Sequence, residues 1–225
     1  MPLPIIESIQ YLNNANGTIV VPSGLVNPVM VVCLGTHQGT ISSVTYGAAG
    51  LTVVATGRSA FNECGDIWVL VNPTAGSATL SISMSGGSWW GATVFILSGA
   101  KQTTTITNNK INSASGSSSS CAVTPPATNC MIIGSAGGEA TYTGSNSPAQ
   151  MLSSTTLTNS SFENSCCGYV GTKSGMPITF SLGMSSGQRY GMAMACIESA
   201  GGDTQLPNGR RIKVGNGMSV SDFAR

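Results

Sequence analysis

The chain is short of charged residues. Only 8% of its 225 residues are Asp, Glu, Lys or Arg, against about 25% in an ordinary soluble domain. The net charge of +1 excludes the broad basic footprint of a nucleic-acid-binding protein. Because the hydrophobic content is near normal, the polar surface must consist of Ser, Thr, Asn and Gly. Such a neutral surface favours association and indicates an assembly subunit, with a secreted domain of uncharged surface as the alternative.

Long hydrophobic runs are missing as well. No apolar stretch reaches the ~20 residues of a membrane helix, so we expect no membrane partner. The N-terminal residues Met1-Pro-Leu-Pro-Ile-Ile-Glu7 have neither the basic region nor the apolar core of a signal peptide. A virion protein that is made in the host cytoplasm and released by lysis fits this expectation.

Residues suited to catalysis or metal binding are sparse. The only histidine, His37, has no nucleophile motif near it, and the cysteines lack the CxxC spacing of zinc sites. Glu63 and Asp66 resemble calcium ligands or a glycosidase carboxylate pair, but a local ion pair with Arg58 is the favoured interpretation. We therefore expect no enzyme activity, no catalytic residue, no metal site and no cofactor.

The seven cysteines cannot all pair within one chain. Cys33 and Cys196 stand in apolar strand patterns, which predicts buried thiols. Cys121 and Cys130 bracket a Pro-Pro loop, and whether they form a disulfide stays open.

Two neighbouring segments define the expected core. Residues 67–71 are apolar on both faces, which predicts a strand in the middle of a sheet. Residues 78–84 alternate between apolar and polar, as in a strand with one face in water. The turn residues Asn72-Pro73 and Gly76 lie between them, so we predict a hairpin.

Similar strands recur with turn signals every 8 to 12 residues or so, and no segment has a helical period. The predicted fold is all-β: an antiparallel, jelly-roll-like β-sandwich with extended N- and C-terminal arms. The expected division is an N-terminal arm (1–12), one sandwich domain (13–200) and an extended tail (201–225). The serine-rich residues 113–120 are predicted to be a flexible loop.

Four motifs carry a resemblance: Ser43-Val-Thr-Tyr-Gly47, Leu51-Thr-Val-Val54, Ile67-Trp-Val-Leu-Val-Asn-Pro73 and Ser98-Gly-Ala-Lys-Gln-Thr-Thr104. The segment Val29 to Ile106 resembles β-sandwich domains of tailed-phage virion proteins and of bacterial surface or secreted proteins. This resemblance implies a fold and brings no catalytic residue with it. Lys101 stands where the family usually has an acid.

These observations lead to one main hypothesis and two alternatives. The chain is expected to be a non-enzymatic virion structural protein, most specifically an exterior capsid decoration (cement) protein of a tailed phage. It would form homo-oligomers, for which a trimer suits the symmetry of a shell, and would bind the major capsid protein through its arms. The alternatives are a glycan- or receptor-binding adhesin module of a tail fibre or cell surface, and a filament subunit that exchanges terminal strands.

The predicted contact residues lie mainly in the two arms. Trp89 and Trp90 would point to opposite faces of a strand, one into the core and the other toward a subunit contact or a sugar. The residues predicted to form subunit contacts are Leu3, Ile5, Ile6, Trp90, Arg210, Arg211, Lys213 and Phe223.

Overall fold

The structure is a computed structural model. It describes residues 3–58, 63–87, 89–102, 112–123, 130–138, 163–171, 178–200, 203–205 and 211–213. Side chains are described in residues 3–58, 63–87, 89–102, 130–137 and 190–200. Within these ranges every regular element is a β-strand, and no helix is long and apolar enough to span a bilayer.

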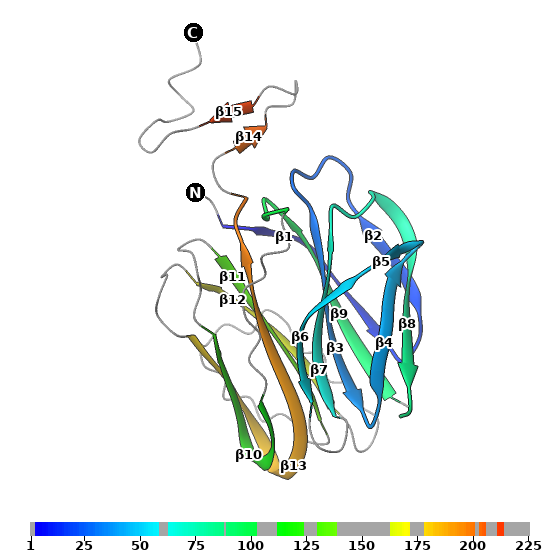
Figure 1. Ribbon diagram of the computed structural model, residues 1–225, viewed down its shortest axis with the longest axis vertical. Coiled ribbons are helices and arrows are strands. Elements are labelled where there is room, and N and C mark those ends of the chain that lie inside the picture. The colour runs from blue at the N-terminus through cyan, green and yellow to red at the C-terminus, as the bar shows by residue number, and fades with distance from the viewer. Residues whose placement is uncertain are drawn as a thin grey trace.

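The strands are numbered in chain order (Figure 1). Their bounds are β1 Ile5–Asn13, β2 Gly17–Val21, β3 Val29–His37, β4 Thr40–Tyr46, β5 Ala49–Gly50, β6 Thr52–Arg58, β7 Cys64–Val71, β8 Gly76–Ser85, β9 Trp89–Ser98, β10 Asn112–Val123, β11 Cys130–Gly138, β12 Glu163–Gly171, β13 Ile178–Glu198, β14 Asp203–Gln205 and β15 Arg211–Lys213.

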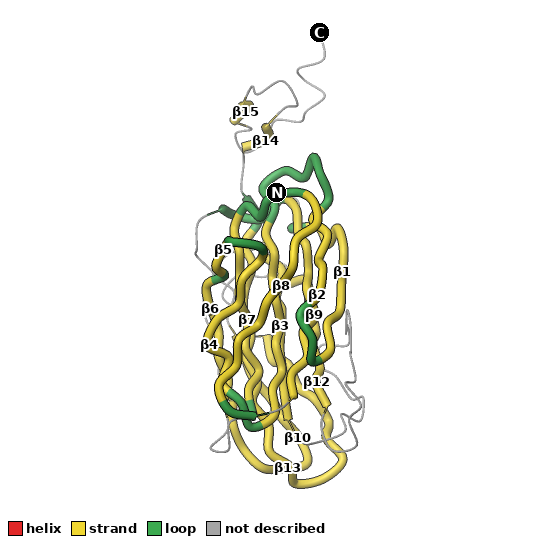
Figure 2. The backbone as a smooth tube through the Cα atoms, turned by 90° about the vertical axis from the view of Figure 1, so that its right-hand side faces the viewer, coloured by secondary structure: helices red, strands yellow, loops and turns green. Residues whose placement is uncertain are grey.

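Three antiparallel sheets pack in three layers (Figures 1 and 2). The central sheet has the order β1-β9-β3-β7-β6, the N-terminal outer sheet β2-β8-β4-β5 and the C-terminal outer sheet β10-β13-β11-β12. The all-β antiparallel sandwich prediction is confirmed. The third layer was not anticipated.

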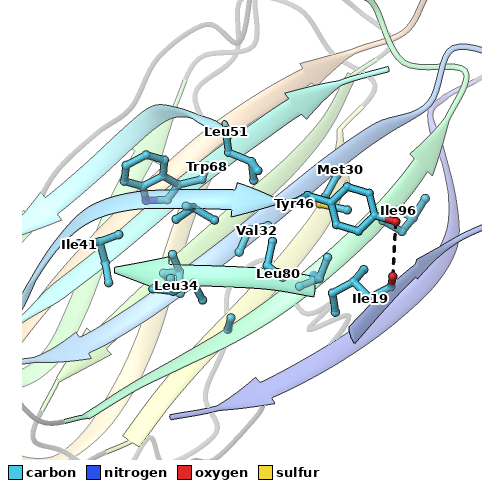
Figure 3. Packing of buried hydrophobic residues seen from close by; sticks show 14 of the residues in the cluster. Ile19, Met30, Val32, Leu34, Ile41, Tyr46, Leu51, Trp68, Leu80 and Ile96 are labelled. Carbon is cyan, nitrogen blue, oxygen red and sulfur yellow. Dashed lines mark hydrogen bonds between the residues drawn. The ribbon is translucent and has the colours of Figure 1, made fainter. Parts of the chain in front are cut away.

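The central sheet is buried on both faces because a hydrophobic core lies on each side of it. One core, shared with the N-terminal outer sheet, includes Met30, Val32 and Trp68 (Figure 3). The other, shared with the C-terminal outer sheet, includes Val31 and Phe95. Successive residues of one strand thus enter different cores, as the period of two requires. This explains why β3 and β9 are apolar almost throughout.

The predicted hairpin between residues 67–71 and 78–84 is wrong, although both segments are strands. β7 pairs with β3 and β6 in the central sheet, whereas β8 pairs with β2 and β4 in the N-terminal outer sheet. The turn after Val71 therefore carries the chain from one layer to the next. The burial predictions are confirmed, since β7 is buried on both faces and Leu80 and Ile82 of β8 face the core.

Three further expectations change. The serine-rich residues 113–120 form part of strand β10 and pair with β13, so they are not a loop. The predicted strands at 177–184 and 188–198 are one long strand, β13. Cys130 is a free thiol, which contradicts a disulfide with Cys121, and the buried free thiols predicted for Cys33 and Cys196 are confirmed.

Glycines allow the C-terminal outer sheet to approach the central sheet closely. A Cβ built on Gly57 of β6 would overlap the carbonyl oxygen of Met192 in β13, and one on Gly191 would overlap that of Gly57. A Cβ on Gly65 of β7 would lie 2.6 Å from the carbonyl oxygen of Ser135. At this end of the molecule the two backbones are therefore in direct contact, which only glycine permits.

The other end is joined by a short polar link between β9 and β13. The backbone N–H of Lys101 donates to the carbonyl of Glu198 (2.9 Å), and the Lys101 Nζ lies 2.8 Å from Glu198 Oε2. Ala100 forms an isolated antiparallel bridge with Ser199. This link fixes the exit of the C-terminal outer sheet relative to the central one.

Candidate functional site

The N-terminal segment is part of the domain. Residues 5–13 form β1 and pair with β9 of the same chain, at one edge of the central sheet. The expectation that residues 1–12 are an arm separate from the sandwich is therefore wrong for this strand, although the extended conformation was correct. The pairing is favoured because Ile6, Ile9 and Leu12 pack against the two cores.

The rest of β1 faces away from the protein. None of its residues is fully buried, and the side chains of Ile5 and Tyr11 are 58% and 51% exposed. Among the described residues, no strand pairs with the outer side of β1. Such an edge carries unpaired backbone N–H and C=O groups that can accept another strand.

A side chain of β1 also closes the adjacent edge of the N-terminal outer sheet. The Gln10 Nε2 donates to the carbonyl of Val20 in β2, and the Val20 N–H donates to Gln10 Oε1, both at 2.9 Å. A single amide therefore makes the pair of bonds that a neighbouring strand would make. Next to it, the Val20 side chain is 48% exposed.

The start of β1 is irregular. The pairing with β9 shifts between Ile6 and Ser8, which leaves Glu7 as the extra residue of a bulge. The Ser98 hydroxyl donates a hydrogen bond to Glu7 Oε1 and holds this side chain. The regular part of the strand therefore begins at Ser8.

The structure places the predicted contact residues differently from one another. Ile5 is exposed, whereas Leu3 and Ile6 are half-buried. Trp90 is buried in the core between the central and N-terminal outer sheets, while Trp89 is 36% exposed. Opposite orientations were predicted correctly, but the exposed residue of the pair is Trp89. Trp90 is a core residue in this chain.

The predicted C-terminal residues are only partly described. Arg211 and Lys213 lie in β15, which pairs with β14 in a separate two-stranded sheet. Arg210 and Phe223 lie outside the described residues. The described part of the tail thus pairs with itself.

His37, at the end of β3, lies beside the buried carboxylate of Glu63: its Nδ1 is 3.5 Å from Glu63 Oε1. Both side chains are buried. His37 was expected to be an ordinary loop residue and Glu63 to be near Arg58, so both expectations need correction. The cross-strand neighbour of His37 in β9 is Trp89.

Asp66 forms the predicted ion pair. Its Oδ2 lies 3.7 Å from an Arg58 guanidinium nitrogen, and the Thr56 hydroxyl donates to Oδ1. Arg58 is further held by a 2.8 Å hydrogen bond to the Thr40 hydroxyl. Burial raises the pKa of Asp66, while Thr56 and Arg58 act in the opposite direction.

These groups do not converge on one reaction centre. Asp66 shares a face of β7 with Trp68 of the first core, whereas Glu63 has the parity of Ile67, which faces the second. Two carboxylates on opposite faces of a sheet cannot flank one glycosidic bond. Burial also raises the pKa of the Cys64 thiol, whose Sγ donates to the Gly39 carbonyl, and this disfavours the thiolate that a nucleophile needs.

Comparisons with protein families, curated proteins and solved structures find no match to this chain. The surface residues Gln10, Tyr11 and Val20 were not identified from the sequence. The alternation of apolar and polar residues through β1 was a usable sign that this segment is a strand with one side in the domain.

Proposed function

We propose that this protein is a non-enzymatic structural subunit of a larger assembly, and that the edge formed by β1 is its main contact surface. The observation that carries the proposal is the open outer side of β1, with Ile5 and Tyr11 exposed on it. Exposed apolar side chains beside unpaired backbone groups are what a strand-adding partner recognises.

Two features of the surrounding surface support this function. Four of the six large exposed hydrophobic residues lie between positions 5 and 26, namely Ile5, Tyr11, Val20 and Val26. Ile5 pairs with Ser98 while the carbonyl of Val26 accepts from Gly99, so both flank the end of β9. The chain carries only 8% charged residues, so little charge repulsion opposes contact with a neighbour.

The specific assembly that we propose is the exterior of a tailed-phage capsid, with the protein as a decoration subunit beside the major capsid protein. This assignment rests on the resemblance of residues 29–106 to virion β-sandwich domains. Contact through a strand edge replaces the extended N-terminal arm as the mode of binding. The described part of the C-terminal tail adds β14 and β15 to the protein's surface.

Immunogold electron microscopy of the native source tests this proposal. Antibodies raised against the full-length chain should label the outer surface of particle shells. Label confined to fibre tips would favour the adhesin alternative, and label found only on free protein would overturn the structural function.

One observation favours a second candidate, a glycan-binding module. Trp89 is 36% exposed at the end of β9, and an exposed indole next to a histidine can stack on a sugar ring. A glycan array probed with the wild-type chain and with Trp89→Ala would detect such binding. Equal signals from both proteins would exclude Trp89 as the sugar platform.

A further inference from the structure

We infer that the partner of the β1 edge is the β1 strand of a second copy of this chain, in an antiparallel pair around a two-fold axis. The two central sheets would then join into one continuous sheet across the dimer. This inference rests on the proposed role of the β1 edge and specifies what occupies it.

The backbone of β1 defines the groups available to the partner. The N–H of Asn14 donates to the Trp90 carbonyl at 2.9 Å. Hydrogen bonding alternates along an antiparallel ladder, so Ser8, Gln10 and Leu12 bond to β9. The N–H and C=O groups of Ile9, Tyr11 and Asn13 therefore point outward, at regular spacing.

One register satisfies these groups and covers the exposed aromatic side chain. A two-fold axis at Gln10 places Ile9 opposite Tyr11 of the second copy, and Tyr11 opposite the second Ile9. Paired residues then lie on the same face of the joined sheet, as the pleat requires. The pairing forms about four main-chain hydrogen bonds and packs an aliphatic residue against an aromatic one on both sides of the axis.

Charge does not oppose this pairing. Glu7 is the only charged residue in β1, and in this register it lies opposite Asn13, away from the second Glu7. The bulge at Glu7 precedes the paired segment, so the strand remains regular from Ser8 to Asn13. The chain's net charge of +1 gives two copies almost no mutual repulsion.

The other edges near β1 are less suited to a partner. The β2 edge is closed at Val20 by the Gln10 amide, and β5 has only two residues. β6, the opposite edge of the central sheet, has its own irregularity between Val53 and Ala55, which interrupts the strand near its centre. Among edges with described side chains, β1 has the longest regular open run.

Sedimentation equilibrium of the full-length chain over a range of concentrations tests the inference. We expect a reversible monomer–dimer equilibrium for the wild type and a monomer for Tyr11→Lys, because a lysine cannot be accommodated against Ile9. The matched control is Val53→Lys on the β6 edge, where the wild-type valine is 44% exposed. It should dimerise like the wild type.

Amide hydrogen exchange gives a readout without any substitution. The outward amides of Ile9 and Tyr11 should exchange more slowly as the protein concentration rises. The amides of Gln10 and Leu12, which bond to β9 in either state, should not change. This pattern remains informative even where Tyr11→Lys fails to fold.

The possible results separate the two proposals. A wild-type monomer at every concentration, a trimer, a dimer that survives Tyr11→Lys in folded form, or uniform exchange along β1 would overturn the self-pairing. Immunogold label on particle shells would in those cases still support the structural function through a different occupant of the edge. Shell labelling that disappears for Tyr11→Lys-bearing particles, together with a wild-type dimer, supports both.

Discussion

Gln10 and Val20 join two sheets through one side chain. The amide of Gln10 in the central sheet both donates to and accepts from the backbone of Val20 in the N-terminal outer sheet, with both bonds at 2.9 Å. This arrangement anchors β1, an edge strand with no fully buried residue, to a second layer. It also removes one of two adjacent open edges and leaves the β1 edge as the exposed one.

Gln10→Ala should therefore loosen β1 without unfolding the domain. Two hydrogen bonds at a partly exposed site contribute about 1 kcal/mol each at most, because water replaces them. We expect the free energy of unfolding in urea to fall by roughly 1 to 2 kcal/mol, with faster amide exchange in β1. An unchanged stability would show that the clamp contributes nothing.

Gln10→Glu provides the matched variant. An ionised carboxylate still accepts from the Val20 N–H but cannot donate to its carbonyl, so repulsion is added at neutral pH. Protonation below about pH 4 restores a donor. The variant should therefore lie closest to wild-type stability in acid, and a deficit that does not depend on pH would contradict this explanation.

The contact between β6 and β13 predicts a strong effect at Gly57. In Gly57→Ala the new methyl group would overlap the backbone carbonyl of Met192, and a backbone atom cannot move aside as a flexible side chain does. We expect a loss of about 3 kcal/mol or more in urea unfolding. Gly50→Ala is the control, because a Cβ there meets nothing within 4 Å, and it should stay within about 0.5 kcal/mol of wild type.

Asp66 predicts a specific dependence of stability on pH. Its folded pKa is raised, chiefly by burial, so the folded state binds this proton more tightly than the unfolded chain does. The resulting stability is fully present below the unfolded pKa of about 3.9 and is lost as pH rises through the folded pKa. The wild type should thus gain most over Asp66→Asn in acid.

Arg58→Gln extends this test. The Arg58 charge lowers the Asp66 pKa, so its removal should raise that pKa further and move the loss of stability to higher pH. Urea unfolding between about pH 3 and pH 7 measures both variants. An advantage of the wild type over Asp66→Asn that grows with pH would reverse the assigned sign.

Much of the fold could be predicted from the sequence, but the pairing of strands could not. Residues 67–71 are apolar on both faces and residues 78–84 on one, and β7 and β8 have these burial patterns. That difference already argued against a hairpin, since adjacent strands of one sheet share the environment of each face. The actual partners of β7 are β3 and β6, and no local pattern encodes the pairing with β3.

The candidate surface was predicted less well for a related reason. Ile5 and Ile6 were identified as contact residues because they are apolar and near the N-terminus. Gln10 carries no local signal, because its partner Val20 is in another sheet. Residues 113–120 were taken for a loop because serine is common in loops, yet they pair with β13. Distant backbone partners override such local preferences.

Tyr46 predicts an effect that reverses with pH. Its hydroxyl donates to the Gly76 carbonyl at 2.8 Å and lies 3.4 Å from that of Ile19 (Figure 3), so it joins β4 to the start of β8. Tyr46→Phe should cost about 1 kcal/mol at pH 7.

Burial raises the pKa of Tyr46, so its contribution is present below the unfolded value of about 10 and is lost as pH rises through the folded pKa. The gap between wild type and Tyr46→Phe in urea unfolding should therefore narrow above pH ~10. Because the same lysines and other tyrosines titrate in both proteins, the difference isolates Tyr46. A gap that widens in alkali would mean that the tyrosinate is stabilised in the fold, which is incompatible with a hydroxyl that donates to two carbonyl oxygens.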